Sequence, residues 1–137
     1  MKPRSNNELE FMRESGRITS RALKVALKSI KVGVSSLEID QKVSEEIQKL
    51  GGSFSFKTVR GYHWASCITF NEQVVHGIPS DRKIVEGDIV SIDLGAIYKG
   101  WHTDAAWSVL VRSGKNEVRS EKVKFLKVGE EALWLGI

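Results

Sequence analysis

A tight turn at Lys99-Gly100 joins two stretches with strand-like alternation, and this hairpin constrains the fold more than any other feature of the sequence. The strands are expected at 89–98 and 101–112, because Gly100 readily adopts the positive φ that a two-residue connection requires. If these two residues form the turn, the residues that flank them lie opposite each other. Every later cross-strand pair is then fixed.

Asp93 and Asp104 lie inside these strands, where Asp is uncommon because its charge resists desolvation and its side chain competes for backbone hydrogen bonds. In the expected register Asp93 faces Ala106 and Asp104 faces Gly95, so both carboxylates project from one face as diagonal neighbours. Their Cα atoms would lie about 7–8 Å apart, close enough to share one divalent ion or two ions about 3.5–4 Å apart. The alternative is that each Asp is a solvated or salt-bridged residue at an antiparallel edge. A three-residue loop would place them on opposite faces.

The region from Asn71 to Trp107 resembles the first metal-binding half of the type I methionine aminopeptidases, which are pita-bread metallopeptidases. The resemblance is carried by CITFNEQVVHGIP and by HGIPSDRKIVEGDIVSIDLGAIYKGWHTDAAW, and it extends over essentially the whole chain. The lead-in CITFNEQVVHGIP is more similar to this family than to the prolidases and proline-specific aminopeptidases. The resemblance implies an α+β fold, half of a pita-bread fold, with helices packed on the outer face of an antiparallel sheet.

The resemblance also implies roles for four residues. Asp93 and Asp104 would bind metal in a centre of two divalent ions, such as Co, Mn, Fe or Zn, with Asp104 the better bridging candidate. His76 would be catalytic and would bind substrate, contacting the scissile amide and stabilising the charge that develops there. Tyr62 would form a wall of the pocket for the first substrate side chain. The family completes its centre with one His and two Glu from a second half, which these 137 residues do not supply.

The function that the resemblance implies is metal-dependent removal of the N-terminal methionine from nascent proteins and peptides. We expect the 137-residue chain alone to be inactive. Two alternatives stay open: a half-length, non-catalytic homologue that binds a peptide or partner, and an aminopeptidase of the prolidase branch. The expected partners are a peptide or nascent-protein N-terminus, near the ribosome, and the missing C-terminal half if it is separately encoded.

Composition limits the number of domains and the cellular compartment that we expect. With 137 residues, 41% hydrophobic and 28% charged, residues 1–137 are expected to form a single domain that stops within a helix beginning near Glu117. No apolar run approaches the roughly 20 residues needed to cross a bilayer, and the first residues are polar, so we expect no membrane association and a cytoplasmic location. The single Cys67 agrees with a reducing compartment and is expected to be a buried, inert thiol. Because Glu117 and Glu121 interrupt the basic cluster around them, no specific nucleic acid binding is expected.

The segments before the hairpin show two periodicities. Apolar residues at helical spacing predict a first helix capped by Asn6 or Asn7. A second helix is expected to begin at the capping box Ser35–Glu38. After the second helix the pattern alternates, which predicts a strand with Phe54 and Phe56 on one side.

Overall fold

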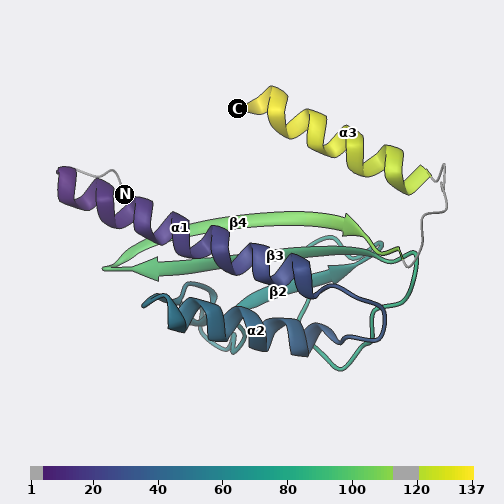
Figure 1. The fold of residues 1–137 in the computed structure, drawn as a ribbon, viewed down its shortest axis with the longest axis horizontal. Coiled ribbons are helices and arrows are strands. Elements are labelled where there is room, and N and C mark those ends of the chain that lie inside the picture. Colours follow the sequence, from purple (N-terminus) through teal and green to yellow (C-terminus); the bar gives the residue numbers. More distant parts are fainter. Residues whose placement is uncertain (1–4, 113–120) are drawn as a thin grey trace.

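The computed structural model describes residues 5–112 and 121–137. Its elements are α1 (Asn6–Ser29), α2 (Ser36–Lys49), β1 (Ser53–Phe54), the 3-10 helix η1 (Phe56–Thr58), β2 (Ser66–Phe70), β3 (Ile89–Tyr98), β4 (Trp101–Leu110) and α3 (Glu121–Gly136). Figure 1 shows α1 and α2 side by side along the sheet, and α3 beyond β4. The predicted start of the last helix near Glu117 lies outside the described residues. No helix in the described ranges is both long enough and apolar enough to cross a membrane.

Strand β3 forms the centre of one antiparallel sheet. It pairs with β4 along its whole length, and with β1 and β2 one after the other at its opposite edge. Helix α1 packs against β3, β4 and α2. This arrangement confirms the predicted α+β fold, an antiparallel sheet with helices on its outer face.

Alternation along β3 separates a buried face from a more open one. Val90, Ile92, Leu94 and Ala96 are fully buried and belong to the same apolar cluster as residues of both helices. The helical side of that cluster includes Ile18, Ala22 and Ala26 in α1 and Ile39, Val43 and Ile47 in α2. Because successive side chains point to opposite faces, the odd-numbered residues of β3 face away from the helices.

Strand β4 shows the same division. The hydroxyl of Thr103 lies 2.8 Å from both the Ser15 and the Thr19 hydroxyl of α1, so Thr103 points toward the helices. Asp104, the next residue, therefore points to the opposite face. The outer edge of β4 pairs with no other strand in the part of the chain that the structure describes.

The predicted cap of the second helix is confirmed, whereas that of the first is wrong by one or two residues. The Ser35 side chain accepts a hydrogen bond from the Glu38 backbone N–H, and the Glu38 carboxylate accepts one from the Ser35 N–H, which completes the capping box. In α1 the cap is Ser5, whose hydroxyl oxygen accepts from the Glu8 N–H at 3.3 Å. Ser5, Asn6 and Asn7 are all residue types that favour the N-cap, and Ser5 takes this position, so Asn6 is the first residue of the helix.

The predicted strand around Phe56 is shorter than its alternation indicated. Strand β1 contains two residues, and Phe56 begins η1 instead. The chain turns here because the Ser55 carbonyl accepts hydrogen bonds from the Thr58 N–H at 3.2 Å and from the Thr58 hydroxyl at 2.6 Å. This local turn takes Phe56 out of the sheet.

Candidate metal centre

The β3–β4 hairpin brings Asp93 and Asp104 to one face of the sheet. Asp93 pairs with Ala106, and Asp104 pairs with Gly95, which confirms the register predicted from the two-residue turn. Both side chains point away from the helices. Asp93 is half-buried and Asp104 is exposed on this face.

The Asp104 carboxyl group lies close enough to Asp93 to perturb its pKa. Burial is the main cause that raises the pKa of Asp93 to about 6, and contact with the Asp104 carboxyl group and its negative charge raise this pKa further. The imidazole of His76 acts in the opposite direction and lowers it. Two like charges on a partly desolvated face are unfavourable without a cation between them.

This donor set fits part of a site for divalent metal ions. Carboxylate oxygens are hard ligands that suit Mg, Ca and Mn and also bind borderline ions such as Zn. The residues paired with the two aspartates, Gly95 and Ala106, are small, and Ser55 and Phe56 lie against Gly95. Within residues 5–112 and 121–137, no cluster of three or more His, Cys, Asp or Glu side chains is arranged to hold a metal. The described residues therefore supply two carboxylates.

His76 lies in the connection between β2 and β3. Its backbone φ of 56° is in the left-handed region, which non-glycine residues adopt uncommonly. The next residue is held tightly: the Ile68 N–H of β2 donates to the Gly77 carbonyl at 2.8 Å. The exposed His76 side chain is near enough to Asp93 for its charge to act on the carboxyl group. Its contact with a substrate amide stays a prediction.

Tyr62 lies in the segment between η1 and β2 and turns its hydroxyl toward β2. The hydroxyl donates to the Ser66 carbonyl at 2.7 Å and lies 3.2 Å from the Cys67 sulfur. Its ring meets those of Phe56 and Trp64 edge to face, with centroids 6.5 and 5.5 Å away. Burial, followed by the contact with Cys67, raises the pKa of Tyr62, so the phenol is neutral. These contacts give Tyr62 a fixed place, and its role as a pocket wall stays a prediction.

Asp40 of helix α2 is hydrogen-bonded to the start of β2, the strand that also accepts the Tyr62 hydrogen bond. The carboxylate of Asp40, which is buried, accepts hydrogen bonds from the backbone N–H groups of Ala65 and Ser66 at 3.0 and 2.9 Å. It also accepts one from the Ser66 hydroxyl at 2.7 Å. Burial raises the pKa of Asp40, and these hydrogen bonds oppose the increase.

Two further side chains, those of Cys67 and His102, lie on the same face of the sheet as Asp93 and Asp104. The sequence predicted no functional role for either. Cys67 pairs with Asp93 across β2 and β3, so its thiol shares this face; burial raises its pKa, as expected of an unreactive thiol. His102 also points to this face, and its Nδ1 lies 2.9 Å from the Ser55 hydroxyl. Alternation along the hairpin places His102 there, but finding Cys67 needs the β2–β3 register.

Comparison with known proteins identifies proteins that are similar in sequence and in fold. The profile of the metallopeptidase family M24 matches residues 10–137. Methionine aminopeptidase 1 of Bacillus subtilis is 41% identical over 130 residues, which are 95% of this chain and 51% of that protein. The crystal structure of methionine aminopeptidase from Thermotoga maritima matches with a TM-score of 0.89 and 34% identity, over 100% of this chain and 54% of that one. Prolidase from Pyrococcus furiosus matches with a TM-score of 0.66 and 25% identity, over 84% and 33%.

These similarities establish both the fold and the family. The chain spans about half the length of the curated relatives that it matches. The structural match to a methionine aminopeptidase over all of this chain confirms that its fold is half of a pita-bread fold. Because the family profile covers nearly all of its length, this chain belongs to metallopeptidase family M24.

Proposed function

We propose that this chain supplies one side of a dinuclear metal centre for the removal of N-terminal methionine from peptides and nascent proteins. The observation that carries the proposal is that Asp93 and Asp104 converge on the face of the sheet away from the helices. The names of its relatives, methionine aminopeptidases, favour methionine as the residue removed. In this proposal the substrate is the N-terminus of a chain near the ribosome, in the cytoplasm.

Each side chain has a distinct part in the proposed reaction. Asp93 and Asp104 would hold two divalent ions, of Co, Mn, Fe or Zn, through their carboxylate oxygens. When bound, such ions supply Lewis-acid activation of water and of the amide carbonyl. His76 would donate a hydrogen bond to the scissile amide and stabilise the charge that develops on it. Tyr62 would limit the pocket for the methionine side chain.

Two carboxylates leave most of a metal coordination shell to water, so the proposed reaction needs further ligands and a general base. We propose that they come from a second segment, equivalent to the part of the relatives that this chain does not match, whether or not it is separately encoded. The 137-residue chain alone is then expected to release no methionine. Positioning of both ions and the base together is what the second segment would add.

A chimeric enzyme tests the proposed function. The chain is joined to the part of the Bacillus subtilis relative that lies outside the matched region, and methionine release from Met-Ala-Ser is measured with Mn²⁺ or Co²⁺. We expect release by the chimera, and a loss of roughly 10²–10³-fold in turnover on His76→Ala with metal content retained. Loss of metal in His76→Ala would instead make His76 a ligand.

The same chimera separates the alternatives. A folded, metal-loaded chimera that cleaves Xaa-Pro dipeptides and not Met-Ala-Ser would place the chain in the prolidase branch. The structural similarity to the prolidase from Pyrococcus furiosus is the reason to test this substrate. A chimera that binds the peptide without cleaving it would favour a non-catalytic role. Either result would contradict the proposed function.

A further inference from the structure

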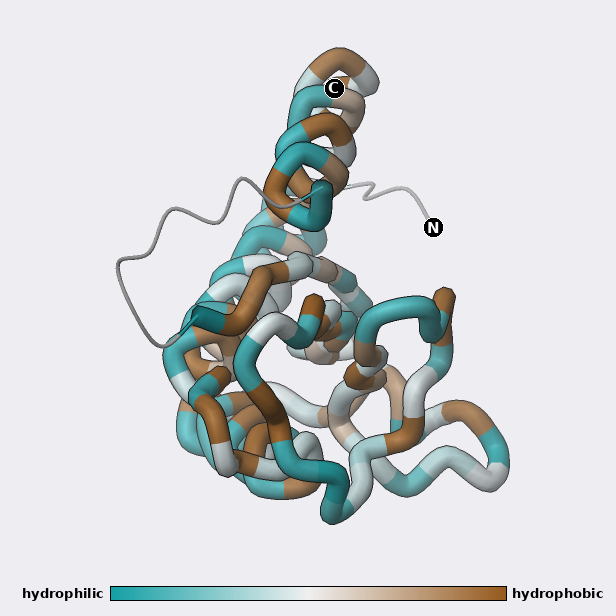
Figure 2. The backbone as a smooth tube through the Cα atoms, turned by 90° about the vertical axis from the view of Figure 1, so that its right-hand side faces the viewer, coloured by the Kyte–Doolittle hydropathy of each residue, from teal (hydrophilic) through white to brown (hydrophobic). Residues whose placement is uncertain are grey.

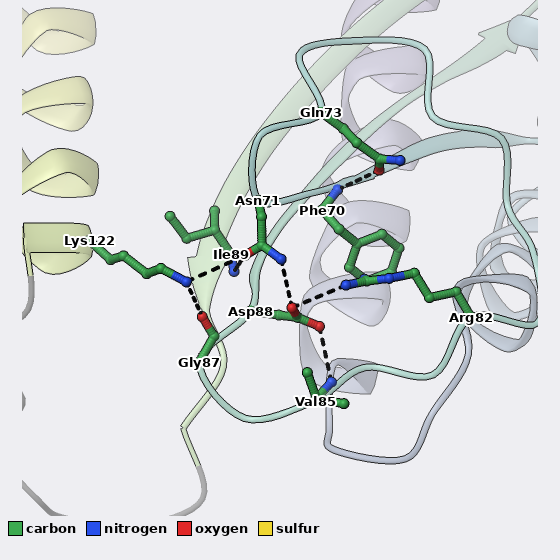
Figure 3. Close-up of polar contacts among 9 residues, drawn as sticks. All are labelled: Phe70, Asn71, Gln73, Arg82, Val85, Gly87, Asp88, Ile89 and Lys122. Atoms are coloured by element: carbon green, nitrogen blue, oxygen red, sulfur yellow. Dashed lines mark hydrogen bonds and ion pairs between the residues drawn. The ribbon is translucent and has the colours of Figure 1, made fainter.

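The loop that carries His76 has both of its ends bonded to one buried carboxylate. The loop leaves β2 at Asn71 and reaches Arg82, and both of these side chains contact Asp88, the residue that precedes β3 (Figure 3). We infer that Asp88 is a positioning residue that sets His76 against the strand bearing Asp93. The catalytic meaning of this inference rests on the proposed function, whereas the structural contacts do not.

Every oxygen of the Asp88 carboxylate has a donor. Its Oδ1 accepts from the Asn71 side-chain amide at 2.8 Å and from the Arg82 guanidinium at 3.2 Å. Its Oδ2 accepts from the Val85 backbone N–H at 3.0 Å. Asp88 is 3% exposed. Burial alone would raise the pKa of Asp88, but these hydrogen bonds lower it below its ordinary value, so the group is an anion near neutral pH.

Asn71 joins the end of β2 to the start of β3. Its backbone N–H donates to the Ile89 carbonyl at 2.9 Å, and its side-chain oxygen accepts from the Ile89 N–H at 3.0 Å. Its φ of 53° is a left-handed conformation that Asn tolerates better than most residues. Figure 3 shows the Asn71 side-chain amide between the two residues, with its oxygen toward Ile89 and its nitrogen toward Asp88.

Arg82 and Gly77 fix the rest of the loop. The Arg82 guanidinium lies over the Phe70 ring, 3.7 Å from its centroid, a cation–π contact with the last residue of β2. A Cβ on Gly77 would lie 2.2 Å from the Ile68 carbonyl oxygen, so only glycine permits this approach to β2. The loop is therefore bonded to Asp88 at its two ends and to β2 at Gly77, the residue after His76.

The carboxylate is required for both ends of the loop. In Asp88→Asn, a single oxygen cannot accept from Val85 on one side and from the two side chains on the other, so at least one donor faces an NH₂ group. A buried donor without an acceptor is costly. The loop should then open locally while the helices and β3 stay packed.

Two measurements by NMR on the 137-residue chain test the inference. Hydrogen exchange of the Ile68 amide reports whether the Gly77 contact holds, and it needs no metal. Broadening of the His76 ring proton by Mn²⁺ reports the distance of His76 from the carboxylates, with the His102 ring as an internal reference on the same face. Ile47→Val is the matched control, because it trims a fully buried residue of α2 that is not part of the loop.

We expect Asp88→Asn to speed exchange of the Ile68 amide about tenfold or more, and to reduce the Mn²⁺ broadening of His76 at least about twofold through a displacement of about 1 Å. His102 should keep its broadening, and Ile47→Val should change neither signal. Unchanged Ile68 exchange and unchanged His76 broadening in Asp88→Asn would overturn the inference. If Asp88→Asn does not fold, Asn71→Gly decides, since glycine keeps the left-handed backbone and removes only the side-chain bonds.

Failure of the proposed function has a separate signature. If Mn²⁺ does not broaden His76 in the wild-type chain, the placement of His76 beside the metal centre is contradicted. The exchange rate of the Ile68 amide then decides by itself whether Asp88 holds the loop.

Discussion

Gly95 is packed closely between β4 and the segment that joins β1 to η1. It pairs with Asp104, and a Cβ built on it would lie 2.8 Å from the Thr103 carbonyl oxygen and 2.9 Å from the Ser55 Cβ. The Thr103 carbonyl belongs to the backbone of β4, so a Cβ on Gly95 would force the hairpin to shift. We predict that Gly95→Ala lowers the free energy of unfolding by about 1–3 kcal/mol, as measured by urea denaturation.

Gly129 provides the control for this substitution. It lies in α3, and nothing lies within 4 Å of a Cβ built on it. Gly129→Ala should be neutral or stabilising by about 0.5–1 kcal/mol, because alanine favours the helix. Equal effects of the two substitutions would show that the close approach at Gly95 does not constrain the hairpin.

Among the elements, α2 has the best-defined start, and its stability should depend on pH. The Ser35 backbone N–H, then Lys83 and the Ser35 hydroxyl, lower the pKa of Glu38 to about 2. An acid with a lowered folded-state pKa stabilises the fold above its unfolded pKa of about 4.3, and this contribution is lost as pH falls toward about 2.

We therefore predict that Glu38→Gln lowers the melting temperature at pH 7, and that its difference from the wild type shrinks as the pH falls below about 4. Melting curves by circular dichroism between pH 7 and pH 3 measure this. Glu45→Gln, on the same helix, should show no such trend. A difference that stays constant with pH would mean that the charge of Glu38 does not stabilise the cap.

The hairpin could be predicted from the sequence because its information is local. The Lys99-Gly100 turn and the alternation around it fix the Asp93–Asp104 register without knowledge of any other element. The contacts of the buried carboxylates of Asp88 and Asp40 could not be predicted from local sequence. Asp88 and Asp40 accept hydrogen bonds from residues 17 and 26 positions away, and the local sequence does not show that these residues meet.

At the scale of the whole molecule, α3 carries several of the most exposed apolar side chains among the described residues, and it lies beside β4. A groove of about 840 Å³ lies between them, lined by residues of both. In Figure 2 hydrophobic and hydrophilic stretches alternate along α3, which rises away from the sheet. No residue of α3 is buried, and Leu135 is 89% exposed. Apolar surface beside a strand edge that pairs with no other strand among the described residues favours association.

We predict that the chain self-associates at high concentration, and that Leu135→Lys shifts it toward monomer in sedimentation velocity experiments. Val74→Lys is the matched control, since Val74 is 86% exposed and lies on the loop between β2 and β3. A wild-type chain that stays monomeric, or an equal shift in the control, would exclude α3 as the associating surface.

The central claim is that Asp93 and Asp104 bind metal together, and titration with Mn²⁺ followed by electron paramagnetic resonance tests it most directly. The wild-type chain should bind Mn²⁺ weakly, because two carboxylates leave most of the coordination shell to water. Asp93→Asn and Asp104→Asn should each weaken this binding about tenfold or more, whereas Asp81→Asn, on the exposed loop, should leave it unchanged. Undiminished Mn²⁺ binding in Asp93→Asn or Asp104→Asn, or an equal loss in Asp81→Asn, would contradict the proposed metal centre.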